Sequence, residues 1–257
     1  MNTDWSEYYD KFVKKNKGDL NDLYYTSSIE HNENINKIFK ILSDDPDAII
    51  LDAGCGVGNF IIPLSYKCKF VYGIDISKES IKLCNERIME KKIKNVVLKV
   101  SSVLKIPLES HCIDKILCLS VFHYLDYHQI ELVIKEFKRI LKKDGILIVN
   151  FLNGGSPHGL STKFLRFIRQ IIKGKKNYPS TNIPLKKLTE IIEKENGTTE
   201  IIHSAYFYPI LFPDTIIRLI NNRFYYERFL PEFLKRYGLS ITLNVRFQKT
   251  VKNYNHT

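Results

Sequence analysis

The sequence has 257 residues, of which 44% are hydrophobic and 26% charged, a composition that suits one large folded domain and argues against long disorder. No stretch approaches the roughly 20 apolar residues that a membrane span needs, and the polar start lacks the apolar core of a signal peptide, so we expect a cytoplasmic protein. Five scattered cysteines without a CxxC pair predict reduced thiols and no metal site. The net charge of +11 is compatible with a nucleic acid, an anionic membrane or a phosphate-bearing substrate, and does not choose among them.

The first 45 residues predict an N-terminal cap. They begin polar and aromatic and then become helical up to Leu42, with Ile35 and Ile38 on one face. Aromatic residues of this segment either anchor a terminal helix or form a lid over a site. They are Trp5, Tyr8, Tyr9, Tyr24 and Tyr25.

Residues 46–152 predict the core of the fold, because short apolar runs alternate with helical segments. Strands buried on both faces are expected at Ala48–Ala53, Phe70–Asp75, Val96–Val100, Ile113–Ser120 and Ile146–Leu152. Helices are expected at Asn59–Lys67, Lys78–Lys91 and Tyr127–Leu141. Repeated strand–helix–strand units indicate right-handed crossovers and a parallel sheet.

Residues 153–257 depart from that alternation and predict insertions on the substrate side, followed by the final strands. Helices are expected over Ser161–Lys173, which is basic and amphipathic, from Pro184 to a close at Gly197, and over the aromatic segment Pro213–Arg236. Strands are expected at Glu200–Tyr206 and Leu239–Phe247, and the alternation in the last one favours an antiparallel strand with one wetter face.

The elements together predict a single α/β domain over residues 1–257. Its fold is a doubly wound, mostly parallel, seven-stranded, Rossmann-like sheet with a last antiparallel strand and helical lid insertions.

A buried strand that ends in an acid and breaks into a glycine loop carries the strongest functional signal. The loop reads Asp52-Ala53-Gly54-Cys55-Gly56-Val57-Gly58, and a helix follows it. Glycine lets a ligand lie against the main chain, and the helix start offers N–H groups. The dinucleotide fingerprint places its third glycine one residue later. The spacing found here resembles the first motif of class I S-adenosylmethionine-dependent methyltransferases.

This resemblance extends over about Ala48 to Leu152 and names a cofactor, S-adenosylmethionine. It implies that Asp75, which ends the second strand, binds the ribose hydroxyls; by itself such an acid would be interpreted as a helix cap. Many members have an acid after the third strand that holds the adenine amino group, whereas this chain has Ser101-Ser102, and Ser102 is a weaker acceptor. The cofactor-binding residues expected on this basis are Asp52, Gly54, Cys55, Gly56, Gly58, Asp75, Ile76, Ser102, Val103, Leu119 and Tyr9.

A methyl transfer to a hydroxyl needs a base, and His123 is the candidate. It follows the fourth strand at the carboxyl edge, where ligands bind in open α/β sheets, and imidazole titrates near neutral pH. The alternative is a packing or hydrogen-bonded histidine at a helix start. A catalytic side chain is optional, because the sulfonium is already an activated electrophile and the protein supplies orientation.

Three functions fit these residues. The leading one is methyl transfer to oxygen or nitrogen of a small molecule, including a metabolite, glycan, lipid or natural-product precursor. The second is an RNA or DNA methyltransferase, disfavoured because Ser120-Val121-Phe122-His123 lacks the Asn/Asp-Pro-Pro-aromatic signature of amino-group enzymes. The third is a non-catalytic cofactor-binding protein. The basic helix 161–173 either packs on the core or meets an anionic membrane or a lipid-linked acceptor.

Overall fold

The structure is a computed structural model that describes residues 5–15, 29–157, 159–160, 181–205, 236–237 and 240–248. Its helices are α1 (Trp5–Lys15), α2 (Ile29–Leu42), α3 (Ile61–Ser65), α4 (Lys78–Glu90), α5 (Tyr127–Ile140) and α7 (Leu185–Lys194), with a short 3-10 turn, η1, at Phe122–Tyr124. Its strands are β1 (Ile49–Ala53), β2 (Phe70–Asp75), β3 (Val96–Val100), β4 (Ile113–Cys118), β5 (Leu141–Leu152), β6 (Gly197–Ala205) and β7 (Ser240–Phe247). The helices expected over Ser161–Lys173 and most of Pro213–Arg236 lie outside the described residues.

These strands form one seven-stranded sheet in the order β3-β2-β1-β4-β5-β7-β6. The first five pair in parallel, and β7 runs antiparallel to both β5 and β6. The predicted fold class is therefore confirmed. Because β1 lies between β2 and β4, the chain reverses its direction of winding there, and a crevice opens at the carboxyl ends of these strands.

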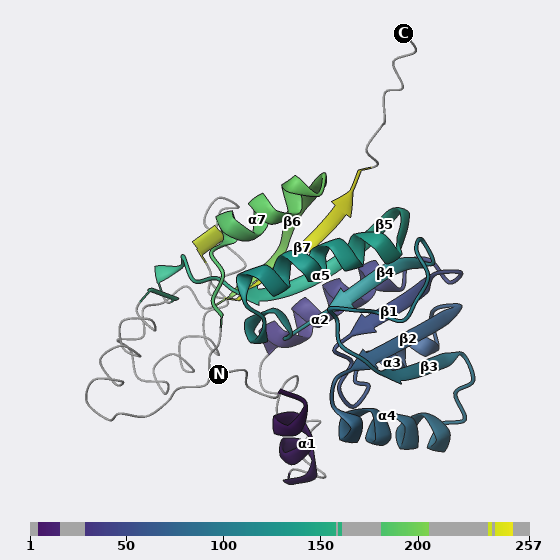
Figure 1. Ribbon diagram of the computed structural model, residues 1–257. Coiled ribbons are helices and arrows are strands. Elements are labelled where there is room, and N and C mark those ends of the chain that lie inside the picture. The colour runs from purple at the N-terminus through teal and green to yellow at the C-terminus, as the bar shows by residue number, and fades with distance from the viewer. Residues whose placement is uncertain are drawn as a thin grey trace.

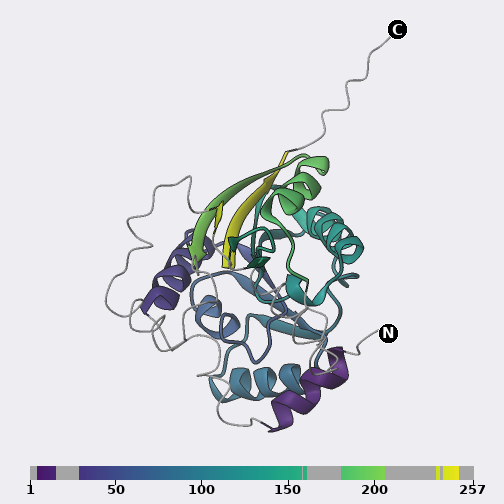
Figure 2. The same ribbon diagram turned by 90° about the vertical axis from the view of Figure 1, so that its left-hand side faces the viewer.

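Helices cover both faces of the sheet (Figures 1 and 2). On one face, α2, α3 and α4 contribute residues such as Leu42 and Leu64 to an apolar cluster that includes Ile50 of β1. On the other face, α5 and α7 pack on a cluster that includes Leu51. Neighbouring residues of β1 thus serve opposite faces, as the twofold repeat of a strand requires. Burial on both faces explains the uninterrupted apolar runs of the central strands.

Two expectations about strand burial are wrong. The strand β3 is not buried on both faces, because it lies at one edge of the sheet; Val97 and Val100 are 38% and 48% exposed. Conversely, β7 has no wetter face along its centre: Thr242 and Asn244 are buried, because β7 lies between β5 and β6. The alternation of apolar and polar residues along a strand shows only which side chains are polar. Whether they are buried depends on the position of the strand in the sheet.

Several element boundaries also differ from those expected. The helix expected over Asn59–Lys67 is the shorter α3, because the glycine loop continues to Phe60, and β4 ends at Cys118 rather than Ser120. The strand β5 begins at Leu141, not at Ile146. Gly197 does not close α7 but begins β6; Asn196 instead makes the turn, with φ 59° in the left-handed region that Asn tolerates.

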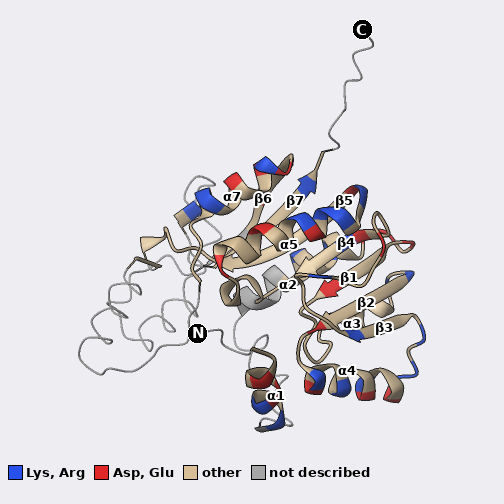
Figure 3. Cartoon of the chain, in the orientation of Figure 1, with Lys and Arg blue, Asp and Glu red and all other residues tan. Residues whose placement is uncertain are grey.

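No helix within the described residues is both long and apolar enough to cross a membrane. Lysine and arginine lie on α4, α5, α7 and the strand ends, with acidic residues among them (Figure 3). In this view the basic residues are spread over several elements rather than gathered on one.

Lys115 is a charged side chain in a buried strand, and it ties α2 to the sheet. Its Nζ donates to the carbonyl oxygens of Ile41 at 2.9 Å and Leu42 at 3.2 Å, and it also pairs with Asp44. The Lys115 side chain is 7% exposed, but that of Asp44 is 59% exposed. Because solvent screens the exposed partner, the two carbonyls at the end of α2 account for most of the stabilisation.

Replacing Lys115 by Met leaves those carbonyls without their donor, and we expect the free energy of unfolding to fall by about 1–3 kcal/mol in urea titrations. Asp44→Asn is the control and should cost less than about 1 kcal/mol. An equal loss in both variants would show that the ion pair, not the capping of α2, carries the interaction.

Candidate active site

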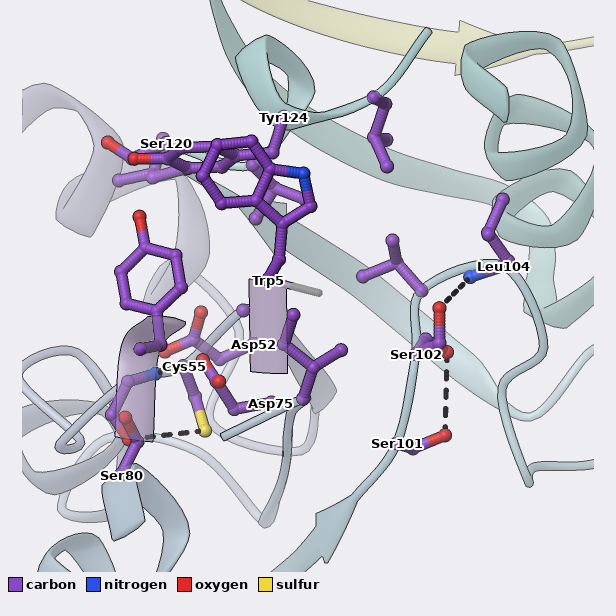
Figure 4. A pocket seen from close by; sticks show the side chains of 18 of the residues that line it. Trp5, Asp52, Cys55, Asp75, Ser80, Ser101, Ser102, Leu104, Ser120 and Tyr124 are labelled. Atoms are coloured by element: carbon purple, nitrogen blue, oxygen red, sulfur yellow. Dashed lines mark hydrogen bonds between the residues drawn. The ribbon is translucent and has the colours of Figure 1, made fainter. Parts of the chain in front are cut away.

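A cavity of about 560 Å³ opens at the carboxyl ends of the parallel strands. Its walls come from α1, the glycine loop after β1, the end of β2, the loop after β3 and the segment after β4, with Thr181 at one side. The switch point of the sheet explains why these segments, distant in sequence, meet here. Figure 4 shows Asp52 and Asp75 near each other in this pocket, with Trp5 beside Tyr124.

Ten of the eleven residues expected to bind a cofactor line this cavity; they are Tyr9, Asp52, Gly54, Cys55, Gly56, Asp75, Ile76, Ser102, Val103 and Leu119. Gly58 does not line it. A Cβ built at Gly58 would lie 2.4 Å from the Cys84 Sγ, so this glycine lets the loop pack against α4. Its φ of +85° is a second reason for glycine here, and its expected contact with a cofactor stays a prediction.

The glycine loop is held by the end of β2. The backbone N–H groups of Gly54 and Cys55 both donate to the Ile74 carbonyl, at 2.8 and 3.0 Å. Gly54 has φ +87°, which an L side chain rarely adopts, and a Cβ there would lie 2.4 Å from the Val121 Cγ2. A Cβ at Gly56, by contrast, would meet no atom within 4 Å, so the main chain at this residue is open to a ligand.

Asp75 links the glycine loop to the start of α4. One carboxylate oxygen accepts from the Gly56 N–H at 2.9 Å, and the other accepts from the Ser77 N–H at 2.9 Å. Burial raises the pKa of Asp75, while these two hydrogen bonds act in the opposite direction. The carboxylate thus lies in the cavity wall in a fixed orientation.

Asp52 is a nearly buried carboxylate, 4% exposed, in the wall of the same cavity. Burial and, to a smaller extent, the charge of Asp75 raise the pKa of Asp52 to about 8. A negative charge on one of these acids disfavours ionisation of the other. A cationic group in the cavity would stabilise the ionised form of both.

The loop after β3 forms the opposite wall. The Ser102 Oγ accepts from the Leu104 N–H at 3.2 Å, and the Ser101 Oγ donates to the Lys105 carbonyl at 3.1 Å. The loop is fixed from α5, where Glu136 accepts from the Ile106 N–H at 2.7 Å. One of the lone pairs of Ser102 is used within the loop, which leaves the hydroxyl limited capacity to accept from a ligand.

The N-terminal helix α1 covers one side of the cavity with Trp5 and Tyr9. Both rings pack on Tyr124, at centroid distances of 4.6 and 5.5 Å. The helix is anchored by Asp10, whose carboxylate accepts from the Ser77 Oγ at 2.6 Å and the Glu79 N–H at 3.2 Å. Of the other lid candidates, Tyr8 does not line the cavity, and Tyr24 and Tyr25 lie outside the described residues.

His123 is not among the residues that line the cavity. Its ring packs against Tyr124 at a centroid distance of 3.9 Å, and burial lowers the pKa of His123 to about 4. The imidazole is therefore neutral at physiological pH. The base role of His123 stays a prediction.

Several lining residues were missed by sequence reasoning, among them Phe12, Ser120, Tyr124 and Gln129. Ser120 and Tyr124 lie within the part of the chain that resembles class I methyltransferases, but no spacing rule indicates which side chains of this segment face a ligand. No group of three or more His, Cys, Asp or Glu that could hold a metal ion occurs in the described part of the chain.

A family model described as a methyltransferase domain matches residues 44–203. The chain belongs to the methyltransferase domain family. The match covers β1 to β6 except the last residues of β6, and so includes the glycine loop and the segment after β4.

Relatives and solved structures extend the comparison. The chain is 35% identical over 126 residues to a ubiquinone biosynthesis O-methyltransferase of Pelagibacter ubique, which covers 47% of this chain and 50% of that protein. It is 27% identical over 242 residues to an uncharacterised protein of Methanocaldococcus jannaschii, covering 91% of this chain and 76% of the relative. Magnesium protoporphyrin IX methyltransferase from Synechocystis PCC 6803, solved with bound SAH, superposes with a TM-score of 0.64 at 17% identity, covering 95% and 98% of the two chains.

Identity at that level shows the common fold alone. The alignments span about half the length or less of the first curated relatives, at 42%, 49% and 50%.

Asp52 should make stability fall as pH rises. The folded state binds the Asp52 proton with a pKa of about 8 against 3.8 for the ordinary group, so deprotonation favours the unfolded state between pH 4 and pH 8. We expect Asp52→Asn, which cannot ionise, to gain stability over the wild type as pH rises from 5 to 8, by at most about 1.4 kcal/mol per pH unit. Urea titrations of the cofactor-free protein measure this difference; a gap independent of pH would contradict the assigned pKa.

Proposed function

We propose that this chain transfers a methyl group from S-adenosylmethionine to an oxygen or nitrogen atom of a small molecule. One observation carries the proposal: a single cavity at the switch point of the sheet brings together the glycine loop, Asp52 and Asp75. Membership of the methyltransferase domain family supports it independently.

The described residues fit such a cofactor. Asp75 would accept from the ribose hydroxyls, and the open main chain at Gly56 would let the ligand approach closely. Asp52 would face the cationic methionyl end, where a positive charge offsets its burial. The apolar faces of the adenine ring would be enclosed by Ile76, Val103 and Leu119. When bound, the cofactor supplies an electrophilic methyl group, and this chain's residues orient it and exclude water.

The acceptor is best matched by a neutral or cationic small molecule. The acidic side chains that line the cavity in the described residues are Asp52, Asp75 and Asp126, and no lysine or arginine among those residues joins them. A phosphate-bearing acceptor would therefore find no basic side chain among these residues to pair with. The named relative from Pelagibacter ubique is an O-methyltransferase, which supports oxygen as the acceptor atom.

The alternatives predict different measurements. An RNA methyltransferase would bind labelled RNA with a steep salt dependence, because phosphate contacts release counterions. A non-catalytic protein of the same fold would bind S-adenosylhomocysteine yet give no turnover with any acceptor in a library. Contact of the basic segment 161–173 with an anionic membrane or a lipid-linked acceptor, and a cytoplasmic location, stay predictions; the segment lies outside the described residues.

The cofactor assignment is tested by Asp75→Ala. This change removes the ribose acceptor and frees the Gly56 and Ser77 N–H groups, so S-adenosylhomocysteine binding measured by calorimetry should weaken by about 1–3 kcal/mol.

Asp114→Ala is the matched control. Asp114 also accepts from a backbone N–H, that of Ile49 at 2.9 Å, but it lies at the other end of the same sheet. The control should bind the ligand as the wild type does. Unchanged affinity of Asp75→Ala would show that Asp75 does not bind the ribose hydroxyls. Absence of binding by the wild type would contradict the cofactor proposal itself.

The proposed base is tested by His123→Gln. With a pKa of about 4, the imidazole is neutral from pH 5 to pH 8, so a base at this position gives no acid limb near pH 6.5 in the profile of kcat/KM. The base role predicts that turnover of a hydroxyl acceptor falls by roughly 10²–10⁴-fold, with the cofactor affinity unchanged. Turnover within two-fold of the wild type would leave His123 as a packing residue.

A further inference from the structure

Ser120 lies in a strained backbone conformation at the edge of the cavity. Its φ is 57°, in the left-handed region that non-glycine residues rarely occupy. It is the second residue after β4 and lines the cavity together with Leu119 and Val121. Such strain persists only where surrounding contacts hold it, and it concentrates at functional sites.

One side chain holds this turn from the neighbouring strand. The Ser120 N–H donates to the Asn150 Oδ1 at 2.6 Å, and both residues are half-buried. The parallel register of β4 with β5 ends at Cys118 opposite Val149, one residue before Asn150. The Asn150 side chain therefore accepts an N–H group of the main chain just beyond the end of the ladder.

From the other side, the same turn is pressed against the glycine loop. A Cβ at Gly54 would lie only 2.4 Å from the Val121 Cγ2, so no space separates the two segments. The strand β4 lies between β1 and β5, so movement of the turn toward β1 is blocked by this contact and would also break the bond to Asn150 on β5. The two constraints fix where Leu119 and Ser120 meet a ligand.

We propose that Asn150 is a positioning residue for the cofactor site: its amide oxygen holds the strained turn at Ser120 and so keeps the wall formed by residues 119–121 in a ligand-ready geometry. This rests on the proposed function for the identity of the ligand. Asn150 is not among the residues that line the cavity, so it acts through Ser120 rather than by touching the ligand.

Three variants test the proposal. Asn150→Ala removes the acceptor. The double variant Asn150→Ala with Ser120→Gly also removes the strain, because glycine adopts φ near +57° without a Cβ penalty. Thr242→Val is the matched control, since Thr242 lies opposite Asn150 in the β5–β7 register and its buried Oγ1 has no hydrogen-bond partner among the described residues.

Two measurements on the full chain separate this proposal from the proposed function. Calorimetry with S-adenosylhomocysteine should show binding about ten-fold weaker in Asn150→Ala, largely restored in the double variant and unchanged in Thr242→Val. Amide hydrogen exchange without any ligand should be faster in residues 119–124 of Asn150→Ala alone.

The outcomes are distinct. Wild-type affinity in Asn150→Ala, or a double variant that binds no better than Asn150→Ala, would overturn the positioning role, because a purely structural loss is not rescued at Ser120. If the wild type binds no S-adenosylhomocysteine, the proposed function fails, and unchanged exchange in Asn150→Ala would overturn the hold on the turn independently.

Discussion

The carboxyl end of β2 is the point on which the site depends. The Ile74 carbonyl accepts two N–H groups of the glycine loop, and the Asp75 carboxylate accepts a third. Parallel pairing places Ala53 beside Ile74, so the loop begins next to the strand that holds it. Three amides that would otherwise be unsatisfied at the end of β1 are thereby hydrogen-bonded, and they fix the turns through which the chain passes from β1 to α3.

The same strand end also positions the helices around the cavity. Ser77, two residues after β2, caps α4 by accepting from the Ser80 N–H, and its hydroxyl donates to Asp10 of α1. A single buried serine therefore connects the start of one helix with the helix that covers the cavity. Because Asp10 also accepts from the first turn of α4, its negative charge lies at the positive end of that helix. The covering helix is located by polar bonds as well as by its aromatic contacts.

The sequence was sufficient for the sheet, because apolar runs separated by helical stripes leave few arrangements of a parallel core. It was also sufficient to predict that Asp52, Gly54 and Asp75 lie together, because the ends of parallel strands converge at one edge of the sheet. It was insufficient for β3 and β7, where exposure depends on which strand lies at the edge of the sheet. Nor could it place Asn150, since a polar residue inside an apolar strand carries no local sign that its partner is a turn 30 residues away.

The charge of the cavity differs in sign from that of the protein, and this difference bears on function. The chain carries +11, yet the charged groups lining the cavity within the described residues are three aspartates. A surface field attracts anions over a distance of about one Debye length, whereas recognition inside a cavity depends on the groups in contact, which act through a lower dielectric. The overall charge is thus a poor guide to the ligand. The proposed ligand, a sulfonium nucleoside that combines a positive charge with hydroxyl groups, would pair with Asp52 and Asp75 together.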